Sequence, residues 1–518
     1  MNRTWLNTIS LWCKENTTAL VVFGIALFLL FFRIGYRTFW MDETMVLSYL
    51  PHSLTGFWNE YTHNPDNHPP LYYFLVLLLS KFLPWNELMV RLTSVVSGFG
   101  IVVLVYIFMK DITKEKRTAL IAAFFTAFSS YFILISQMAR YHSISGFAAL
   151  LTLYFFYRLF TYGFTTRTWW GFVLSFVFVG YVDYPHFVYV GLIVNAVYAY
   201  RLIRRRPLMP LRRWLLGQGI VAILCSPMVW FLYHRIVIQG DGGWSDVNLL
   251  ANSWVHIIAG IFFHVYSYFF GEHIFPWNYF VFTSGCVVLL GILTGCVRVF
   301  QKKYWDIRVG YIVLLSMALM VLNTLIMNVA DARYNFIVYP KFAFVAYPIT
   351  IMAFVLCLRH LTVRTQYVLY FLWAGVAVIG LFHFYTATHY LNGSYYRTFE
   401  SFEFVRDNAN PGDRLAITPD AGEGLYLFYR ETYFRHLTPL GYHDIPHAPS
   451  GSRVWFFSTG HDGPGESVTT ESRVPEGYII LKQYDSVPLD PTFKMVKEKI
   501  LDRPSYTYKY TVFLLQKV

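Results

Sequence analysis

Long apolar runs separated by short polar segments fill the first three quarters of the chain. A helix needs about 20 apolar residues to cross the roughly 30 Å hydrocarbon core of a bilayer. Runs of about this length predict eleven transmembrane helices, at residues 17–37, 91–109, 118–138, 142–160, 168–183, 185–201, 214–233, 277–297, 309–328, 335–358 and 365–388. A shorter apolar run at 71–83 follows Pro69 and Pro70 and covers only about 20 Å as a helix. We expect it to lie in the membrane interface.

The pattern changes after residue 389, where glycine, proline and mixed charges become frequent. Residues 398–408 predict a helix, and short β-rich runs predict strands at 415–418, 425–429, 454–457, 478–481 and 506–515. The chain is therefore expected to be a polytopic α-helical membrane protein with a small C-terminal α/β soluble domain. The predicted domains are 1–389, with outer loops at about 38–90 and 234–275, and 390–518.

Charge assigns the two sides of the membrane. The net charge is +12, and 28 of the 42 Lys and Arg residues precede residue 390. If the N-terminus is cytoplasmic, 20 of these 28 residues lie in the N-terminal tail and the inner loops. Basic loops resist translocation and stay in the cytoplasm, so the charge distribution supports this orientation. The C-terminal domain is then extra-cytoplasmic. Because the basic excess follows the inner loops, we expect a lipid bilayer as partner and no nucleic acid.

Polar residues gather in the outer loops and at the outer helix ends. They are the segments 40–43, 67–73, 140–142, 183–186 and 331–334, together with Arg91. Charged groups at membrane depth are costly and usually face an aqueous cavity or a partner. Convergence from several separate loops therefore indicates a site.

Carboxylates beside arginine and histidine suit a substrate that is both lipidic and anionic. A carboxylate can accept a proton from a hydroxyl nucleophile, while cations stabilise a departing phosphate. The chain has no Gly-x-x-x-x-Gly-Lys phosphate loop and no dinucleotide fingerprint. A lipid phosphate is thus favoured over a nucleotide as the leaving group.

These residues resemble the C-type (GT-C) glycosyltransferases, which use polyprenyl-phosphate sugars. Asp42-Glu43, His68-Pro69-Pro70-Leu71 and Arg91 look like the protein O-mannosyltransferases. Gln137-x-x-Arg140-Tyr141 and Arg333-Tyr334 with Pro340 look like the bacterial branch that contains the lipid A aminoarabinose transferase and related lipopolysaccharide sugar transferases. The resemblance spans residues 1 to about 390.

The resemblance implies roles for individual residues. Asp42 matches the general base and Glu43 a neighbour that shapes the site. The donor phosphate is expected at His68, Arg91, Arg140, Arg333 and Lys341, and substrate contacts at Tyr72, Tyr141, Asp183, His186 and Tyr334. His68 stands where the aminoarabinose transferases carry a lysine, and Asn67 replaces their acidic residue.

Asn67, in place of an acidic residue, gives no support to a metal-assisted reaction. His256, His264, His273 and Glu272 match no compact zinc spacing. We therefore assign no metal ligand and no cofactor from the sequence, and leave a divalent metal open as an alternative that no ligand spacing supports.

The expected activity is transfer of one sugar, with inversion, from a polyprenyl-phosphate-linked donor to an extra-cytoplasmic lipid, glycan or protein hydroxyl. The expected location is a bacterial or archaeal plasma membrane. A flippase for lipid-linked glycans and a ligase that uses a diphosphate donor are the alternatives. For single residues, Asp42 and Glu43 could instead cap a short helix, Arg140 and Arg333 could be interface anchors, and Asp183 could form a structural ion pair.

Overall fold

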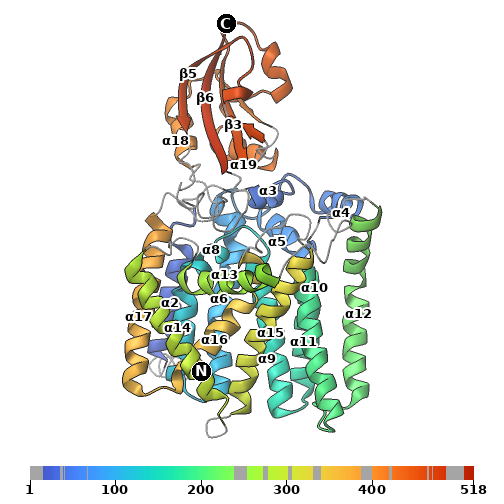
Figure 1. Cartoon of the computed structure of the whole chain (residues 1–518). Coiled ribbons are helices and arrows are strands. Elements are labelled where there is room, and N and C mark those ends of the chain that lie inside the picture. Colours follow the sequence, from blue (N-terminus) through green and yellow to red (C-terminus); the bar gives the residue numbers. More distant parts are fainter. Residues whose placement is uncertain are drawn as a thin grey trace, which may run out of the picture.

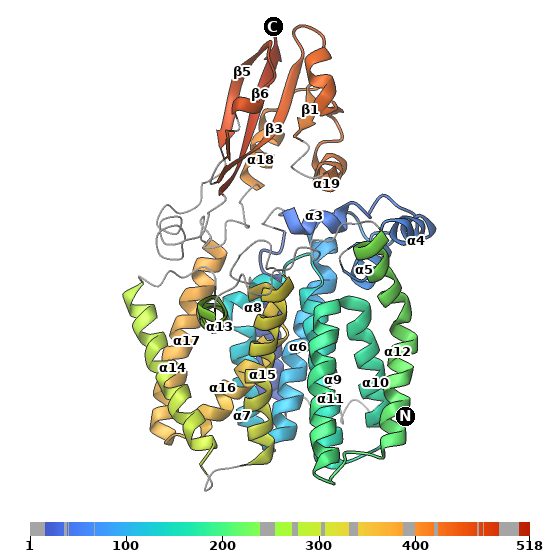
Figure 2. The same ribbon diagram turned by 45° about the vertical axis from the view of Figure 1, so that its right-hand side comes forward.

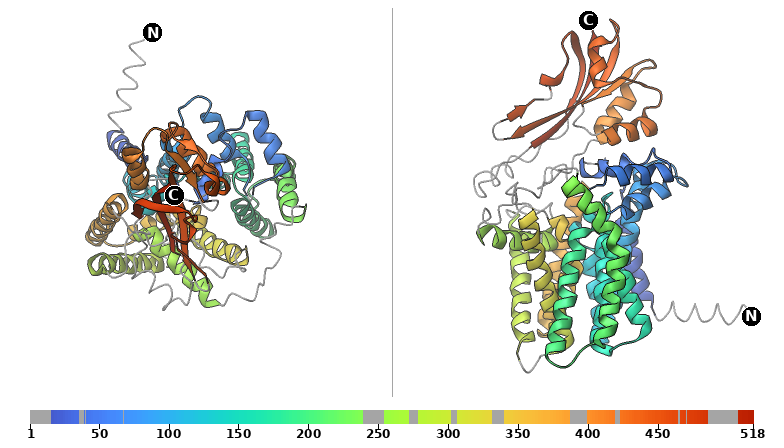
Figure 3. Two further views of the ribbon diagram at one scale, coloured as in Figure 1. Left: turned by 90° about the horizontal axis from the view of Figure 1, so that it is seen from above. Right: turned by 90° about the vertical axis from the view of Figure 1, so that its right-hand side faces the viewer.

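The computed structural model describes residues 16–35, 39, 41–66, 68–238, 254–271, 278–301, 306–330, 340–386, 399–418, 423–463, 466–469, 471–485 and 507–518. These residues form a bundle of upright helices with a small sheet domain at one end (Figure 1). We call that end the sheet-domain end. Seen from above, the sheet domain lies over the middle of the bundle (Figure 3).

Each predicted apolar run overlaps a helix of the bundle in the part of the chain that the structure describes. Its upright helices are α2 (Thr17–Phe31), α6 (Glu87–Thr113), α7 (Lys116–Ala127), α9 (His142–Tyr162), α10 (Thr166–Val182), α11 (Tyr184–Ile203), α12 (Leu211–Tyr233), α14 (Tyr279–Val299), α15 (Ile307–Ala330), α16 (Ala346–Arg359) and α17 (Val363–Thr386). Seven of the described helices are long and apolar enough to cross a bilayer, or eight if a bent pair counts as one span. The prediction of a polytopic α-helical membrane protein is confirmed, although α2 and α16 are shorter, with 15 and 14 residues.

The bent pair consists of α7 and α8 (Ser130–Ser136), which meet at 66°. Ser129 begins the second helix, since its side chain accepts a bond from the Phe132 amide. The break leaves backbone carbonyls to be satisfied in an apolar setting. The Tyr347 hydroxyl of α16 provides for two of them, at 3.0 Å from the Thr126 oxygen and 3.3 Å from that of Phe125. The bend leads directly into the polar segment that begins at Gln137.

Short helices cover the sheet-domain end of the bundle. They are α3 (Met41–Leu47), α4 (Leu54–His63) and α5 (Leu71–Leu79). The nine residues of α5 span about 14 Å, too little to cross the membrane, as predicted for the run at 71–83.

The expected long loop at 234–275 is partly helical, which corrects the prediction. It contains the π-helical turn η1 (His234–Ile238) and helix α13 (Trp254–Phe270), which lies crosswise to the bundle (Figures 1 and 2). Its apolar side chains Tyr268, Phe269 and Phe270 are buried. Burial of these side chains against the bundle stabilises α13, in a segment for which the sequence predicted a loop. The 3₁₀ turn η2 (Pro340–Ala343) packs beside it.

The C-terminal region forms one mixed sheet with strand order β2-β1-β3-β6-β5, and β4 pairs with β3. Strand β1 is parallel to β2 and β3, and β6 is antiparallel to β3 and β5. The strands are β1 (Arg414–Ile417), β2 (Thr438–Pro439), β3 (Arg453–Gly463), β4 (Glu466–Val468), β5 (Tyr478–Asp485) and β6 (Thr507–Lys517). The helical elements are α18 (Phe399–Asn408), α19 (Glu423–Tyr433) and the 3₁₀ turns η4 (Tyr442–His447) and η5 (Glu471–Arg473). The predicted boundary at 389/390 falls outside the described residues.

The strand predicted at 425–429 is wrong, because these residues lie in helix α19. Phe428 and Tyr429 are buried, and Tyr433 stacks on Tyr429 one turn later. This helix packs on α3 of the membrane part. One apolar cluster therefore continues from Phe39 of the outer loop to Trp455 in the sheet.

Candidate active site

A buried ion pair joins α3 to α6 at the sheet-domain end. The Arg91 guanidinium donates to both carboxylate oxygens of Glu43, at 3.2 Å each. Both side chains are buried, and the Arg91 cation also lies over the Phe39 ring at 4.7 Å. A paired, bidentate geometry is what allows two charges to be removed from water.

The same pair holds neighbouring backbone. Arg91 donates to the Ile34 carbonyl at 2.6 Å, just beyond α2, and Glu43 accepts from the Ala139 amide at 2.6 Å. Gln137 adds bonds of 3.0 Å to the carbonyls of Leu30 and Phe32. The end of α2, the start of α3 and the segment after α8 are thus tied together.

Arg140, the next cation along this segment, is also buried. Its guanidinium lies 3.4 Å from the Tyr73 hydroxyl and 5.4 Å from the centre of the Tyr141 ring. The Tyr141 ring in turn stacks on His68, with ring centres 4.0 Å apart. Tyr72 is linked to the Arg140 backbone through Ser94. The Ser94 hydroxyl lies 3.0 Å from Tyr72 Oη and donates to the Arg140 carbonyl.

A second acidic group lies on the other side of His68. Asp183 forms a close ion pair with His186 Nδ1, and that nitrogen lies 2.5 Å from the Ser145 hydroxyl. The second carboxylate oxygen of Asp183 faces His68 Nδ1 at 4.0 Å. Among the described residues, that oxygen, His68 Nδ1 and His186 Nε2 are buried without a hydrogen-bond partner.

The electrostatics of this cluster favour an anion. Burial, reinforced by the charges of Arg140 and Lys341, holds the pKa of His68 well below its usual value. Burial also raises the pKa of the Tyr72 and Tyr73 hydroxyls. His68 and both tyrosines are therefore neutral at pH 7, while Arg140 and Lys341 supply positive charge.

The structure brings most of the predicted site residues into one region. His68, Tyr72, Arg140, Tyr141, Asp183 and His186 are linked by the contacts above, Lys341 acts on them electrostatically, and Glu43 and Arg91 form the adjoining pair. Asn67, Arg333 and Tyr334 lie outside the described residues. Asp42 belongs to α3, but its side chain lies outside them too.

Sequence reasoning missed Ser145 and Tyr73 as members of the cluster. Ser145 follows His142 by three residues, so both lie on one face of α9. Tyr73 directly follows Tyr72 in a motif that was already singled out. Helical spacing would have found Ser145, and Tyr73 lay within the polar segment 67–73.

Of the four residues named in the 234–275 segment, the structure describes the side chain of His264. His264 is buried in α13, 3.3 Å from the Thr324 hydroxyl of α15. The side chain of His256, together with Glu272 and His273, lies outside the description. Within the described ranges, no group of three or more His, Cys, Asp or Glu side chains could hold a metal ion.

The sheet domain contacts this region directly. The Tyr433 hydroxyl donates to the Glu87 carboxylate at 3.1 Å, and the Tyr429 hydroxyl accepts from the Phe39 amide at 3.2 Å. Glu87 lies one turn before Arg91 on α6. Helix α19 is thereby joined to the groups that position α3.

The chain is similar to known proteins in sequence over part of its length and in fold over most of it. The profile of the dolichyl-phosphate-mannose-protein mannosyltransferase family matches residues 66–238. The ArnT structure from Cupriavidus metallidurans, bound to undecaprenyl phosphate, superposes with a TM-score of 0.52 at 9% identity, covering 85% of this chain and 93% of ArnT. The chain has the GT-C glycosyltransferase fold.

The family match supports a glycosyltransferase, and the matched segment of this GT-C chain contains His68, Arg140 and Asp183. An uncharacterized protein of Aquifex aeolicus (strain VF5) is 28% identical over 223 residues, 42% of this chain and 44% of that relative. The chain thus spans less than half of its relative's length. The apo oligosaccharyltransferase of Archaeoglobus fulgidus superposes with a TM-score of 0.47 at 11% identity, covering 83% of this chain and 65% of that one.

Proposed function

We propose that the protein transfers one sugar from a polyprenyl-phosphate donor to a hydroxyl of an acceptor outside the cytoplasm. The observation that carries this proposal is the buried cationic cluster of Arg140 and Lys341 beside neutral His68. It lies at one end of a membrane bundle and largely within the family-matched segment. The similar fold of ArnT, whose structure contains undecaprenyl phosphate, supports the lipid phosphate as ligand.

In the proposed reaction, the Asp42 carboxylate accepts the proton of the acceptor hydroxyl. The hydroxyl oxygen attacks the anomeric carbon, and the bond from that carbon to the phosphate oxygen breaks with inversion. Arg140, Lys341 and His68 hold the departing polyprenyl phosphate, together with Arg333. Tyr72, Tyr141, Tyr334 and His186 contact the substrates.

Glu43 and Arg91 act differently in this proposal. The described bonds of the Arg91 guanidinium go to Glu43 and Ile34. We therefore assign both residues to positioning α3, which carries Asp42, rather than to direct phosphate contact. Asp183 positions His186 and limits the movement of His68.

The test is single-turnover release of polyprenyl phosphate by purified protein. The donor is a polyprenyl-phosphate sugar, and the acceptor is an extract of membrane glycolipids and proteins. We expect release that depends on the acceptor. Release only from a diphosphate-linked donor would indicate a ligase, and binding without release from either donor would indicate a flippase.

A further inference from the structure

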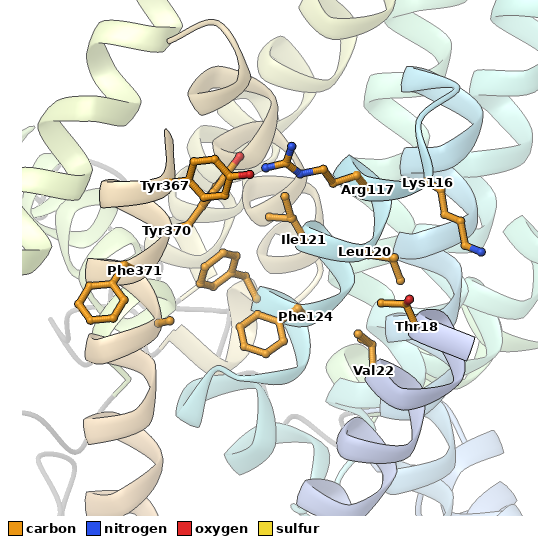
Figure 4. A pocket seen from close by; sticks show the side chains of 12 residues that line it. Thr18, Val22, Lys116, Arg117, Leu120, Ile121, Phe124, Tyr367, Tyr370 and Phe371 are labelled. Carbon is orange, nitrogen blue, oxygen red and sulfur yellow. The ribbon is translucent and has the colours of Figure 1, made fainter. Parts of the chain in front are cut away.

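A groove opens on the side of the bundle near the end opposite the sheet domain. It lies between α2, α7 and α17 and has a volume of about 750 Å³. Its walls are mostly apolar, with Val22, Leu120, Ile121, Phe124, Phe371 and Ala374 among the lining side chains (Figure 4). This groove shares no residue with the candidate active site.

The groove follows the helix axes for most of one leaflet. From Arg117 to Phe125 on α7 the lining extends over about 12 Å, and from Tyr367 to Ala374 on α17 over about 10 Å. One leaflet contributes about half of the roughly 30 Å hydrocarbon core. An extended acyl chain therefore fits along it.

Basic groups stand at one end of the groove. Lys116 and Arg117 begin α7, and the Arg117 side chain points toward Tyr367 and Tyr370 (Figure 4). The Arg117 guanidinium lies 5.1 Å from the centre of the Tyr367 ring. Among the described residues, Arg117 has no carboxylate partner.

Glu115, which directly precedes the two basic residues in the sequence, is engaged elsewhere and does not pair with Arg117. Glu115 forms an ion pair with Arg359 and accepts a bond of 2.8 Å from the Thr118 hydroxyl. The groove is thus cationic at its end and apolar along its length. A free anion would match only the first property and a neutral lipid only the second.

We propose that this groove binds one acyl chain of an anionic phospholipid, whose phosphate contacts Arg117 and Lys116. The charge pattern of the sequence places this end toward the cytoplasm, where the leaflet is rich in anionic lipid. The inference does not depend on the proposed sugar transfer.

The bound lipid joins two helices that already meet at their other ends. Near the sheet-domain end, Arg33 donates to the Tyr385 carbonyl at 2.8 Å, and the Tyr385 hydroxyl donates to the Leu29 carbonyl at 2.6 Å. Those bonds link α2 to α17 there, whereas the groove separates them at the opposite end. Filling it should therefore stabilise the bundle.

Native mass spectrometry and thermal unfolding of the full chain in detergent test the proposal. The probes are phosphatidylglycerol, phosphatidylcholine with the same acyl chains, and inorganic phosphate. We expect one tightly retained phosphatidylglycerol and a higher unfolding temperature with it. Phosphatidylcholine should bind at least tenfold more weakly, and phosphate alone should have no effect.

Two variants locate the site. Lys116→Gln/Arg117→Gln should weaken phosphatidylglycerol binding about 30-fold, since each basic group adds to the attraction. Its control is Arg204→Gln/Arg205→Gln, an exposed basic pair that lines no part of the groove. Ala374→Trp should block the groove, whereas Val378→Trp, one turn further along the exposed face of α17, should not.

Equal retention of both lipids by the unmodified chain would overturn the proposal. So would phosphatidylglycerol binding that persists unchanged in the Lys116/Arg117 double variant or in a folded Ala374→Trp protein.

Discussion

Two clusters of buried charge adjoin each other at the sheet-domain end, and they differ in how far their polar atoms are satisfied. Glu43 and Arg91 bond to each other in two places and to backbone on both sides. In the second cluster, one oxygen of Asp183 and one nitrogen each of His68 and His186 are buried without a hydrogen-bond partner in the described part of the chain. Unsatisfied buried groups are costly and call for an explanation such as a ligand. We infer from this contrast that the first cluster holds the fold, and that the second cluster binds substrate in the proposed reaction.

The largest effect is expected at Asp42, which stands next to the first cluster in sequence. Asp42→Asn keeps volume and hydrogen bonding but cannot accept a proton, so turnover should fall by about two to four orders of magnitude. Donor affinity should change little. The fall in turnover is measured as single-turnover release of polyprenyl phosphate at matched protein levels.

A capping role for Asp42 gives the opposite result. Asn caps a helix about as well as Asp, so near-normal turnover in Asp42→Asn would leave the capping explanation and remove the catalytic one. Glu60→Gln is a useful control, because Glu60 is an exposed acid of the same outer loop.

Substitutions in the first cluster should lower the free energy of unfolding. Arg91→Ala leaves the Glu43 carboxylate buried without its partner, which costs about 3–5 kcal/mol. We expect a lower unfolding temperature and less folded protein. Arg91→Ala/Glu43→Ala should recover part of the loss, because no uncompensated charge remains. A stable Arg91→Ala protein with weakened donor binding would instead favour direct phosphate contact.

Arg140 belongs to the second cluster, so its loss should act on binding. Arg140→Ala should weaken donor affinity by about 1.5–3 kcal/mol, the range for a hydrogen bond to a charged group. Arg140→Lys should retain only part of the affinity, because the lysine ammonium group cannot form the bidentate contact that a guanidinium forms with phosphate. Titration with a fluorescent polyprenyl-phosphate analogue measures both variants. Unchanged affinity in Arg140→Ala would reduce Arg140 to an interface anchor.

His68 predicts a pH effect of known sign. Its pKa is held below 6.5 by burial and by the charges of Arg140 and Lys341, so the unfolded chain binds a proton at a pH where the folded chain does not. The free energy of unfolding should therefore fall as the pH decreases below about 6.5. Unfolding curves of His68→Gln between pH 7.5 and 5.5 should show a smaller fall than those of the unmodified chain.

The sequence predicted the membrane helices because lipid exposure makes the apolar pattern continuous over each span. It also predicted that most of the polar site residues lie together at one end of the bundle, since they stand at helix ends and in the connections between helices. It did not predict that Arg91 pairs with Glu43 across 48 positions, because an arginine at a helix end has the same sequence pattern whether it binds a phosphate or pairs with a carboxylate. The helix α19 was predicted as a strand because Tyr and Phe favour strands locally, whereas packing on Phe39 and α3 decides its structure. Long-range pairing of this kind leaves no local signal.

The smallest effect is expected where the sheet domain meets the first cluster. Tyr433→Phe removes the hydroxyl that donates to Glu87, and the bond is worth about 1.5–3 kcal/mol at most because its acceptor is a carboxylate. Tyr429 remains bonded to Phe39 and keeps α19 on α3, so the expected result is looser docking rather than unfolding. Hydrogen exchange of the α19 backbone amides should become faster, and turnover should fall only a few-fold. Tyr442→Phe, in the sheet domain away from α3, provides the control. If Tyr433→Phe changed neither hydrogen exchange in α19 nor turnover, the sheet domain would not help to position α3, and the first cluster alone would hold the helix that carries Asp42.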